Sequence, residues 1–456
     1  MKFLKAVLIC GLLSACGEDD TGNREVIALT SPDGHSFQFM PIIEDGVSDI
    51  TVTIAWATDW SYDAANHPAV PFVGAEAILS GGTSTLKPQA LLEVFDDANA
   101  GGHLSAGADY IYGELGFPRE YTDKIVPLAA EMLAKPQLDP AWVSRIAAGL
   151  MANQEQSKAQ SATQMWMAAR VAIFDDAPIL GYLSLPDTKG IADVTRDMVF
   201  EWHRQTLTQD TAAIVVTGAI NAADAGRVVD TLLGQLPQGP ARPAGVSAPN
   251  FAQRTILLHL PDAEKTTIGL IGQLPPTREG NDLVDLLAVR ILGNSDGPLF
   301  DAVRSELRAS YGLQAGYANF DRSARVLFIT GEVEGEKLVA ARDVILQTYA
   351  DFRQDPQIGD FEKLRDGLAE GTDDNVKYVN VAAQTIREFL LDGQDVKMAP
   401  KLGDVIRQIT IDDVQMRLRS AFPKADDLIV IVASPDADAL PGACVITQIL
   451  QAATCP

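Results

Sequence analysis

The chain has 456 residues, of which 47% are apolar and 21% are charged, and its formal net charge is −25. This length suits two domains, and the apolar content argues for packed cores rather than disorder. The excess of acidic residues repels phosphate polyanions and anionic lipid surfaces, so nucleic acid is excluded as a partner.

The first fifteen residues have the pattern of a removable secretory signal. Met1–Lys5 carry two positive charges, Ala6–Leu13 is an almost unbroken apolar run, and Ser14 and Ala15 are the small residues expected before a cleavage site. A spanning helix would need about 20 apolar residues, and the polar residues 17–20 follow at once. We therefore expect the segment to be removed.

The run Leu13-Ser14-Ala15-Cys16 resembles the lipobox of bacterial lipoproteins, in which the cysteine becomes the diacylated first residue of the mature chain. The resemblance implies a chain anchored by Cys16 at the periplasmic face of a bacterial membrane, either inner or outer. The alternative is an ordinary signal peptide with an incidental cysteine.

Two further cysteines remain once Cys10 has left with the signal and Cys16 is acylated. These are Cys444 and Cys455. In an oxidising exported compartment they are candidates for a disulfide that pins the C-terminal tail, and the alternative is two unpaired thiols.

A fixed offset of 215 residues (409 minus 194, and 429 minus 214) runs through the chain. Val194–Val199 recurs as Ile409–Val414, and the strand-like Ile214–Val216 recurs as Ile429–Ile431. In both copies a threonine at the expected N-cap precedes an amphipathic stretch and then a β-branched run. We expect two halves of one design; a single mixed domain is the alternative.

Each half is expected to open with alternating strands and to continue with helices. The strands are predicted at Thr51–Trp56 in the first half and at Thr255–His259 and Thr267–Ile271 in the second, with hairpins near Gly107 and Phe320. This order predicts an α+β fold of two homologous α/β sandwich halves, each burying one face of its sheet.

The boundaries between these parts follow from composition. Residues 237–250 are rich in proline and glycine without an apolar period, which is typical of an extended linker. The predicted organisation is a signal over 1–15, a flexible tether over 16–32, a first domain over 33–236, the linker, and a second domain over 251–456.

A short apolar helix that ends at a Gly-Gly-Thr turn is predicted over Val70–Thr83. Its layout resembles the zinc-binding helix of the insulinase-like (M16) metallopeptidases, where a His-x-x-Glu-His run precedes a Gly-Thr turn. In the intact motif two histidines bind zinc from one helical face and the glutamate acts as general base. Here Val73 and Ala77 stand at the histidine positions and Glu76 at that of the base. The resemblance therefore implies a degenerate metal site with an idle base.

No other residues supply the missing ligands. The family's third ligand is a glutamate 70 to 80 positions on; Trp142–Asn153 contains no acid, and Glu155 is the closest candidate. The histidines show no pair at ligand spacing and are expected to be surface or satisfied core residues: His35, His67, His103, His203 and His259. His103 precedes Leu104–Tyr110, which resembles the family's edge strand, where substrate backbone pairs by strand addition. We expect no metal on this chain.

A complementary signal lies in the second half, where Pro298–Ala315 reads as a helix running into a strand. This stretch resembles the part of M16 peptidases in which an arginine and a tyrosine, seven positions apart, reach the substrate carbonyl. Arg304 and Tyr311 stand at that spacing, and both side chains can donate hydrogen bonds to a developing oxyanion. Ser305 replaces a frequent glutamate, and Arg308 is a rival for Arg304. The alternative is a solvated arginine beside a core tyrosine.

The resemblance covers residues from about Asp33 to Asp436 and implies the family's LuxS/MPP-like metallohydrolase fold. M16 proteins of this length often work as pairs, in which one subunit bears the zinc motif and the other supplies the arginine and tyrosine. The first hypothesis is therefore a non-zinc subunit, inactive alone, whose partner holds the zinc and whose substrate is a peptide. It would touch the membrane through its lipid anchor only.

Two other hypotheses remain open. The chain could be a lipid-anchored peptide-binding or scaffold protein without catalysis. An enzyme active alone is the least supported, because no metal ligands and no Ser/His/Asp grouping are visible.

Overall fold

The computed structural model describes residues 24–44, 46–184, 188–240, 242–310, 312–356 and 359–456. The predicted signal, Cys16 and Tyr311 lie outside these ranges. Within them, no helix combines the length and apolarity needed to cross a membrane.

The first sheet has six strands in the order β1-β2-β6-β3-β5-β4. Strand β3 contains the predicted Thr51–Trp56 and pairs antiparallel with β5 and β6, whereas β2 runs parallel to β6. Strand β1 lies inside the range 16–32 predicted as a tether, so the sheet begins at Ile27. The strands are β1 (Ile27–Thr30), β2 (Ser36–Pro41), β3 (Asp49–Ala57), β4 (Gly101–Ala106), β5 (Tyr110–Pro118) and β6 (Ala213–Gly218).

The second sheet repeats this arrangement with the order β12-β7-β11-β8-β10-β9. Five strands occupy equivalent positions in the two sheets: β2, β6, β3, β5 and β4 of the first correspond to β7, β11, β8, β10 and β9 of the second. This correspondence confirms the duplication predicted from the 215-residue offset. The predicted hairpins are confirmed as β4–β5 and β9–β10. The strands are β7 (Thr255–His259), β8 (Thr266–Leu274), β9 (Leu313–Asp321), β10 (Ala324–Val333), β11 (Ile429–Ser434) and β12 (Cys444–Ile446).

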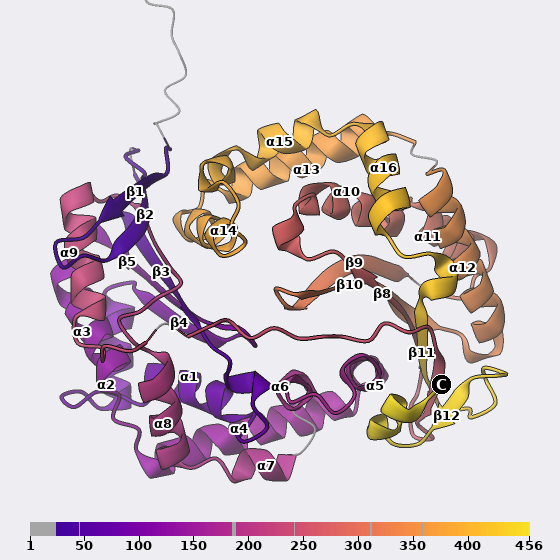
Figure 1. The fold of residues 1–456 in the computed structure, drawn as a ribbon, viewed down its shortest axis with the longest axis horizontal. Coiled ribbons are helices and arrows are strands. Elements are labelled where there is room, and N and C mark those ends of the chain that lie inside the picture. The colour runs from indigo at the N-terminus through magenta and orange to yellow at the C-terminus, as the bar shows by residue number, and fades with distance from the viewer. Residues whose placement is uncertain (1–23, 45, 185–187, 241, 311, 357–358) are drawn as a thin grey trace, which may run out of the picture.

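Helices cover both sheets (Figure 1). In the first half they are α1 (Val70–Ser80), α2 (Pro88–Asp97), α3 (Thr122–Ala134), α4 (Pro140–Lys158), α5 (Ser161–Phe174), α6 (Ile179–Ser184), α7 (Thr188–Ala192), α8 (Arg196–Thr206) and α9 (Ala222–Leu233). In the second half they are α10 (Asp282–Gly293), α11 (Pro298–Phe300), α12 (Leu338–Gln354), α13 (Phe361–Asn375), α14 (Val379–Leu391), α15 (Leu402–Gln408) and α16 (Ile411–Ala421). Between 234 and 254, the described residues form neither helix nor strand.

The predicted N-caps of the repeated helices α8 and α16 are confirmed. Thr195 Oγ1 accepts the backbone N–H of Met198 at 3.3 Å, and Thr410 Oγ1 accepts that of Asp413 at 3.2 Å. A side-chain oxygen here satisfies one of the N–H groups that a helix leaves without an intrahelical partner. Equivalent helices therefore start at equivalent points in both halves.

The two halves exchange one helix each. Helices of the first half cover one face of the first sheet, but its α5 packs on β8 and β11 of the second sheet. Conversely, α14 of the second half packs on β3 and β6 of the first sheet. Each half therefore buries one face of its sheet with its own helices, and the exchanged helix of the other half packs on the opposite face.

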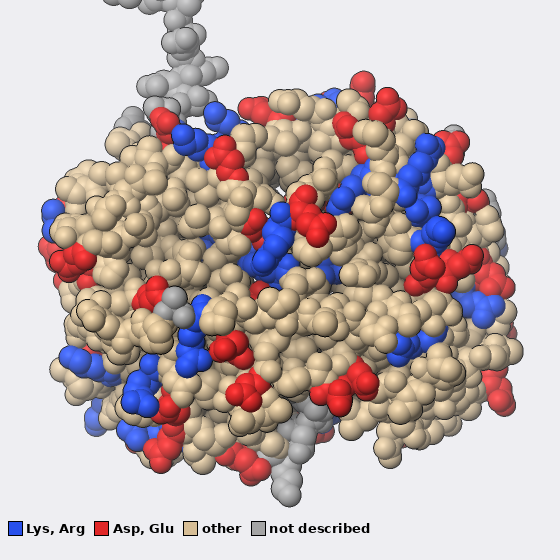
Figure 2. Space-filling model, viewed as in Figure 1, with Lys and Arg blue, Asp and Glu red and all other residues tan. Residues whose placement is uncertain are grey.

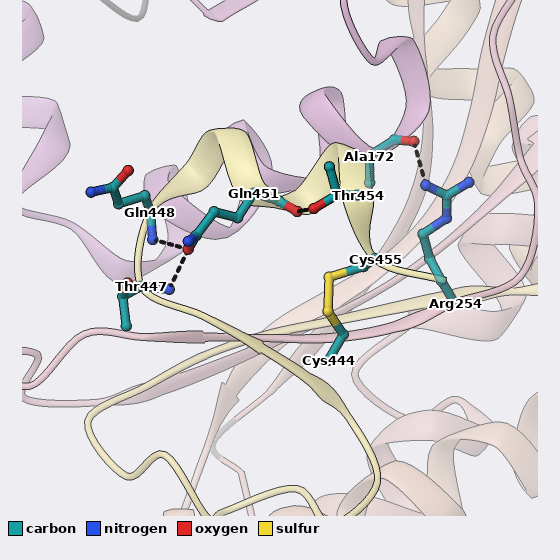
Figure 3. The surroundings of a disulfide bond; sticks show 8 residues. All are labelled: Ala172, Arg254, Cys444, Thr447, Gln448, Gln451, Thr454 and Cys455. Carbon is teal, nitrogen blue, oxygen red and sulfur yellow. Dashed lines mark hydrogen bonds between the residues drawn. A yellow bond between two sulfur atoms is a disulfide. The ribbon is translucent and has the colours of Figure 1, made fainter.

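The C-terminal tail packs on the exchanged helix α5 and is held by a disulfide. Cys444 and Cys455 form a disulfide with their Cα atoms 5.8 Å apart, as the sequence suggested. The bond ties β12 to the 3-10 helix η8 (Ile449–Thr454), which packs on α5. In the same region Arg254 donates to the carbonyl of Ala172 at 3.1 Å (Figure 3). The last residues of the chain thus hold a first-half helix against the second sheet.

Candidate functional site

The positions expected for zinc ligands are filled by core packing. Helix α1 has buried residues nearly all round, and Val73 and Ala77 are both 0% exposed. Gly74 lies against the indole of Trp202 on α8, where an added Cβ would come within 2.5 Å of the ring. Among the residues that the structure describes, no group of three His, Cys, Asp or Glu side chains could hold a metal ion.

The candidate for a third ligand lies away from the other positions. Helix α4 packs against α1, and the indole N–H of Trp142 donates to Ser80 Oγ at 3.0 Å. Glu155 is thirteen residues further along α4, which corresponds to about 20 Å of helical rise. Its carboxylate pairs with Lys158 at 3.4 Å. Glu155 is therefore not aimed at the degenerate motif around Glu76.

A cavity of about 460 Å³ opens beside the exposed Glu76, between the first sheet and helices α1, α2 and α3. Its interior is apolar, and the acidic side chains among its lining residues are Glu76, Asp96 and Glu114. The apolar part of the wall includes Ile54, Trp56, Ile78, Leu91, Phe95, Leu104, Leu115, Met132 and Leu133. Such a site suits an apolar group that is attached to something polar or cationic.

Strand β4 borders this cavity and forms an edge of the first sheet, since it pairs only with β5. The edge strand predicted after His103 therefore exists, although it spans Gly101–Ala106 rather than the later residues up to Tyr110. His103 stands opposite Glu114 in the register. Glu114 accepts a hydrogen bond of 2.6 Å from Gln384 on the exchanged helix α14. The free edge thus lies next to residues from both halves.

The five histidines are dispersed, and none stands in a ligand group. His203 is buried, with its Nε2 2.6 Å from the carbonyl oxygen of Leu133. Burial lowers the pKa of His203 below its usual value, and the contact with Leu133 offsets part of this. His259 Nε2 lies 3.1 Å from the carbonyl of Pro435, while His103 is exposed. His203 is thus a core residue held in its neutral form.

Arg304 lies on a separate groove in the second half. It belongs to the π-helical turn η4 (Asp301–Glu306), is exposed, and places its guanidinium 4.8 Å from the ring centroid of Phe300. The groove has a volume of about 610 Å³ and includes Lys265, Arg304, Arg308, Ser310, Glu332 and Glu334 in its lining. Arg304 is accordingly free to reach a group that enters from outside.

The rival Arg308 lines the same groove in a left-handed backbone conformation, with φ at +54°. Its carbonyl accepts a hydrogen bond of 2.8 Å from Lys337 Nζ. Tyr311, the expected second donor, lies outside the described residues. Both arginines thus line the same groove, and either one could be the arginine that donates to a substrate carbonyl.

A buried polar network, which the sequence interpretation missed, joins the two halves at their hairpins. The backbone N–H of Arg322 donates to Asp109 at 2.9 Å, and the guanidinium of Arg322 pairs with Asp392 at 2.6 Å and with Glu388. Tyr62 Oη donates to Asp321 at 2.7 Å. Acidic and basic side chains gather at the middle of the molecule, where the halves meet (Figure 2).

Burial governs the ionisation of this network. It raises the pKa of Asp109, although the Arg322 backbone N–H and charge oppose this shift. Burial also raises the pKa of Asp321, but hydrogen bonds from Ser247, Ser323 and Tyr62 outweigh it and leave that pKa below the usual value. The sequence offered one indication of this network, namely that charged residues stand next to the turns of two otherwise apolar hairpins.

Residues 193–368 match the family model described as the peptidase M16 inactive domain. Over these residues the chain resembles the M16 peptidase family. No curated protein matches this chain.

Solved structures share the fold over nearly the whole chain. A peptidase M16 inactive domain from Pseudomonas fluorescens is 17% identical, with a TM-score of 0.79, and the match covers 90% of this chain and 98% of that one. The periplasmic protease PqqL from Escherichia coli is 13% identical, with a TM-score of 0.69, over 97% of this chain and 50% of that one. A mutant of the ferredoxin protease FusC, in complex with Arabidopsis ferredoxin, is 13% identical, with a TM-score of 0.71, over 95% and 48%. The chain thus spans about half the length of PqqL and FusC.

Proposed function

We propose that this M16 protein is the non-zinc subunit of a two-chain zinc peptidase, which donates Arg304 and Tyr311 to a substrate carbonyl bound at a partner's metal. The observation that carries the proposal is a contrast between two sites. Val73 and Ala77 are sealed into the core where zinc ligands would stand, whereas Arg304 remains exposed on an open groove. Decay of an unused enzyme would be expected to affect both sites.

The arrangement of the chain supports action in trans. Helix α1 and the turn after α11, which carries Arg304, lie at opposite ends of the molecule (Figure 1). One chain therefore does not bring these two sites together. PqqL and FusC contain about twice the length of the matched region, so a second module of similar size is available to them within one chain. Here a partner M16 chain with an intact His-x-x-Glu-His would supply it.

In this scheme the chain contributes hydrogen-bond donors to the substrate carbonyl. When zinc-bound water on the partner attacks a peptide carbonyl, negative charge develops on the carbonyl oxygen. A guanidinium and a phenol placed close to that oxygen stabilise the developing charge. Glu76 lacks a metal-bound water to activate and stays idle in this scheme.

The proposed location is the periplasmic face of a bacterial membrane, with the mature chain anchored through diacylated Cys16. The signal-like residues 1–15 and the lipobox support this location. The periplasmic location of PqqL, which shares the fold, is consistent with it.

The test is to purify the chain from its native membrane and to identify M16 proteins that accompany it. We expect a partner with an intact zinc motif, peptide cleavage by the pair, no cleavage by this chain alone, and no stoichiometric zinc on the isolated chain after dialysis. One tightly held zinc per isolated chain, or full peptidase activity without a partner, would refute the proposal.

A second candidate is a peptide-binding protein without catalysis, and the cavity beside β4 favours it. The free strand edge could pair with an extended peptide while the cavity accepts an apolar side chain. Calorimetric titration with extended peptides that carry one aromatic side chain tests this reading. Binding without cleavage in every combination of chains would favour it, whereas cleavage by the reconstituted pair would favour the first.

A further inference from the structure

The proposed lipid anchor restricts which face of the molecule can point toward the bilayer. Cys16 precedes Arg24, the first described residue, by eight positions. Eight residues span at most about 29 Å even when fully extended. The surface around Arg24 is therefore held within a short distance of the membrane if Cys16 is acylated.

Contacts define what surrounds Arg24. Its guanidinium donates to the carbonyl of Val376 at 2.9 Å and pairs with Glu44 at 2.8 Å. These bonds place two loops beside the start of the described chain, one after β2 and one between α13 and α14. The loops share a core cluster, because Ile42 packs with Ala382 and its neighbours on α14. β1 and β2 lie beside α14 in Figure 1.

Each of these loops exposes a large apolar side chain within two residues of a contact of Arg24. Ile43, adjacent to Glu44, is 82% exposed, and Tyr378, two residues after Val376, is 64% exposed. Met398, on the 3-10 helix η6 (Val396–Lys401) that joins the same cluster through Ala399, is also exposed. Single exposed apolar residues are ordinary, but these three stand on segments that meet in one core cluster through Ile42, Ala382 and Ala399, and we refer to them together as the patch.

The charge of this patch differs from that of the chain as a whole. Two acids near it are paired, Glu44 with Arg24 and Asp374 with Lys377 at 2.7 Å, while Glu25 beside Arg24 is exposed. Lys397 and Lys401 are exposed on η6 beside Met398. Lysines and a tyrosine at such a position can reach lipid headgroups while their apolar parts stay in the interface. The two ion pairs and the two lysines thus offset part of the acidic charge in this region.

We propose that Ile43, Tyr378 and Met398 form a membrane-contacting face that rests in the headgroup region and orients the body of the protein on the bilayer. This inference rests on the proposed lipid anchor at Cys16. An anchor of one modified residue leaves rotation free, and a second, apolar contact fixes which side of the body faces the lipid.

The test uses the full-length, diacylated protein in vesicles of phosphatidylethanolamine and phosphatidylglycerol that contain a headgroup-nitroxide lipid. Ile43→Cys and Phe200→Cys, each with a thiol-reactive fluorophore, give two matched variants, since Cys16 is acylated and Cys444 and Cys455 are joined. Phe200 is 47% exposed on α8, across the first half from β1 (Figure 1). We expect the nitroxide to quench the label at position 43 several-fold more than the label at position 200.

Mass analysis of the N-terminal peptide shows whether Cys16 is acylated, so that the lipid anchor and the membrane-contacting face are tested separately. Equal quenching of both labels in protein with diacylated Cys16 would overturn the membrane-contacting face and leave the anchor intact. An unmodified Cys16 would overturn the anchor and the face together. Strong quenching at position 43 alone would support both.

Discussion

The backbone N–H of Arg322 donates to Asp109 Oδ2 at 2.9 Å and joins the β9–β10 hairpin to the β4–β5 hairpin. Both residues are more than 90% buried, so neither charge is hydrated by bulk water. The guanidinium of Arg322 continues the network to Asp392 and Glu388. The two halves are thus joined through Asp109 and the backbone of Arg322, while the guanidinium of Arg322 ties its hairpin to the end of α14 in its own half.

Arg322→Ala should destabilise the protein by about 3–5 kcal/mol, because it leaves the buried carboxylate of Asp392 without its cation. Urea unfolding of the two proteins measures the difference. The control is Arg204→Ala, which removes an exposed arginine paired with Glu201 at 3.0 Å and should leave the midpoint almost unchanged. Equal midpoints for Arg322→Ala and Arg204→Ala would show that the buried ion pair between Arg322 and Asp392 does not stabilise the protein.

Gly74→Ala should cost about 1–3 kcal/mol, since the added Cβ would come within 2.5 Å of the Trp202 ring in a packed core. The matched control is Gly149→Ala, a glycine within α4 that has nothing within 4 Å of the new methyl group. That change should stabilise the helix by about 0.5–1 kcal/mol. Thermal unfolding of both variants distinguishes the two directions, and a shift of the same sign in both would contradict the packing described for α1.

Local features were predictable from the sequence because they depend on neighbouring residues. Thr195 and Thr410 cap their helices through hydrogen bonds to residues three positions further along the chain. The strand Thr255–His259 matches its predicted range. The 215-residue offset then gave the duplication, since a repeated pattern predicts a repeated unit.

Long-range features were not predictable. An amphipathic pattern shows that α5 and α14 bury a face, but not that each buries it against the sheet of the other half. The network of Asp109 and Arg322 was not predicted, because the sequence does not reveal the opposing hairpin that buries them. Val73 and Ala77 can be read from the sequence at the two histidine positions, whereas the cavity beside Glu76 depends on how four elements meet.

The stability of the protein should fall as the pH drops below about 6.5, partly because of His203. Burial lowers the folded-state pKa of this imidazole, so the unfolded chain binds the proton more readily and is favoured as the pH falls. His203→Gln retains a donor for the carbonyl of Leu133 but does not titrate. Melting temperatures between pH 7.5 and 5 should decline less steeply for the variant than for the native protein. Parallel declines would mean that His203 does not contribute.

Reduction of the Cys444–Cys455 disulfide should lower stability by about 3 kcal/mol, the entropic effect expected for a loop of this size. The bond holds η8 on α5, so reduction should also release apolar surface there. Urea unfolding with and without a reductant measures the first effect, and the double variant Cys444→Ser and Cys455→Ser is the control that should not respond to the reductant. An unchanged midpoint in the reduced native protein would contradict the structural role of the bond.

The measurement that tests the central claim most directly is turnover by this chain reconstituted with its proposed zinc-bearing partner, with single substitutions in this chain. Arg304→Ala and Tyr311→Phe should each lower kcat by about 10²- to 10³-fold, because each removes a donor to the developing oxyanion. Arg308→Ala, which removes the second arginine from the same groove, should have little effect. If the pair assembles normally and cleaves peptides equally fast with Arg304→Ala and with Tyr311→Phe, this chain does not donate to the transition state and the proposed role is wrong.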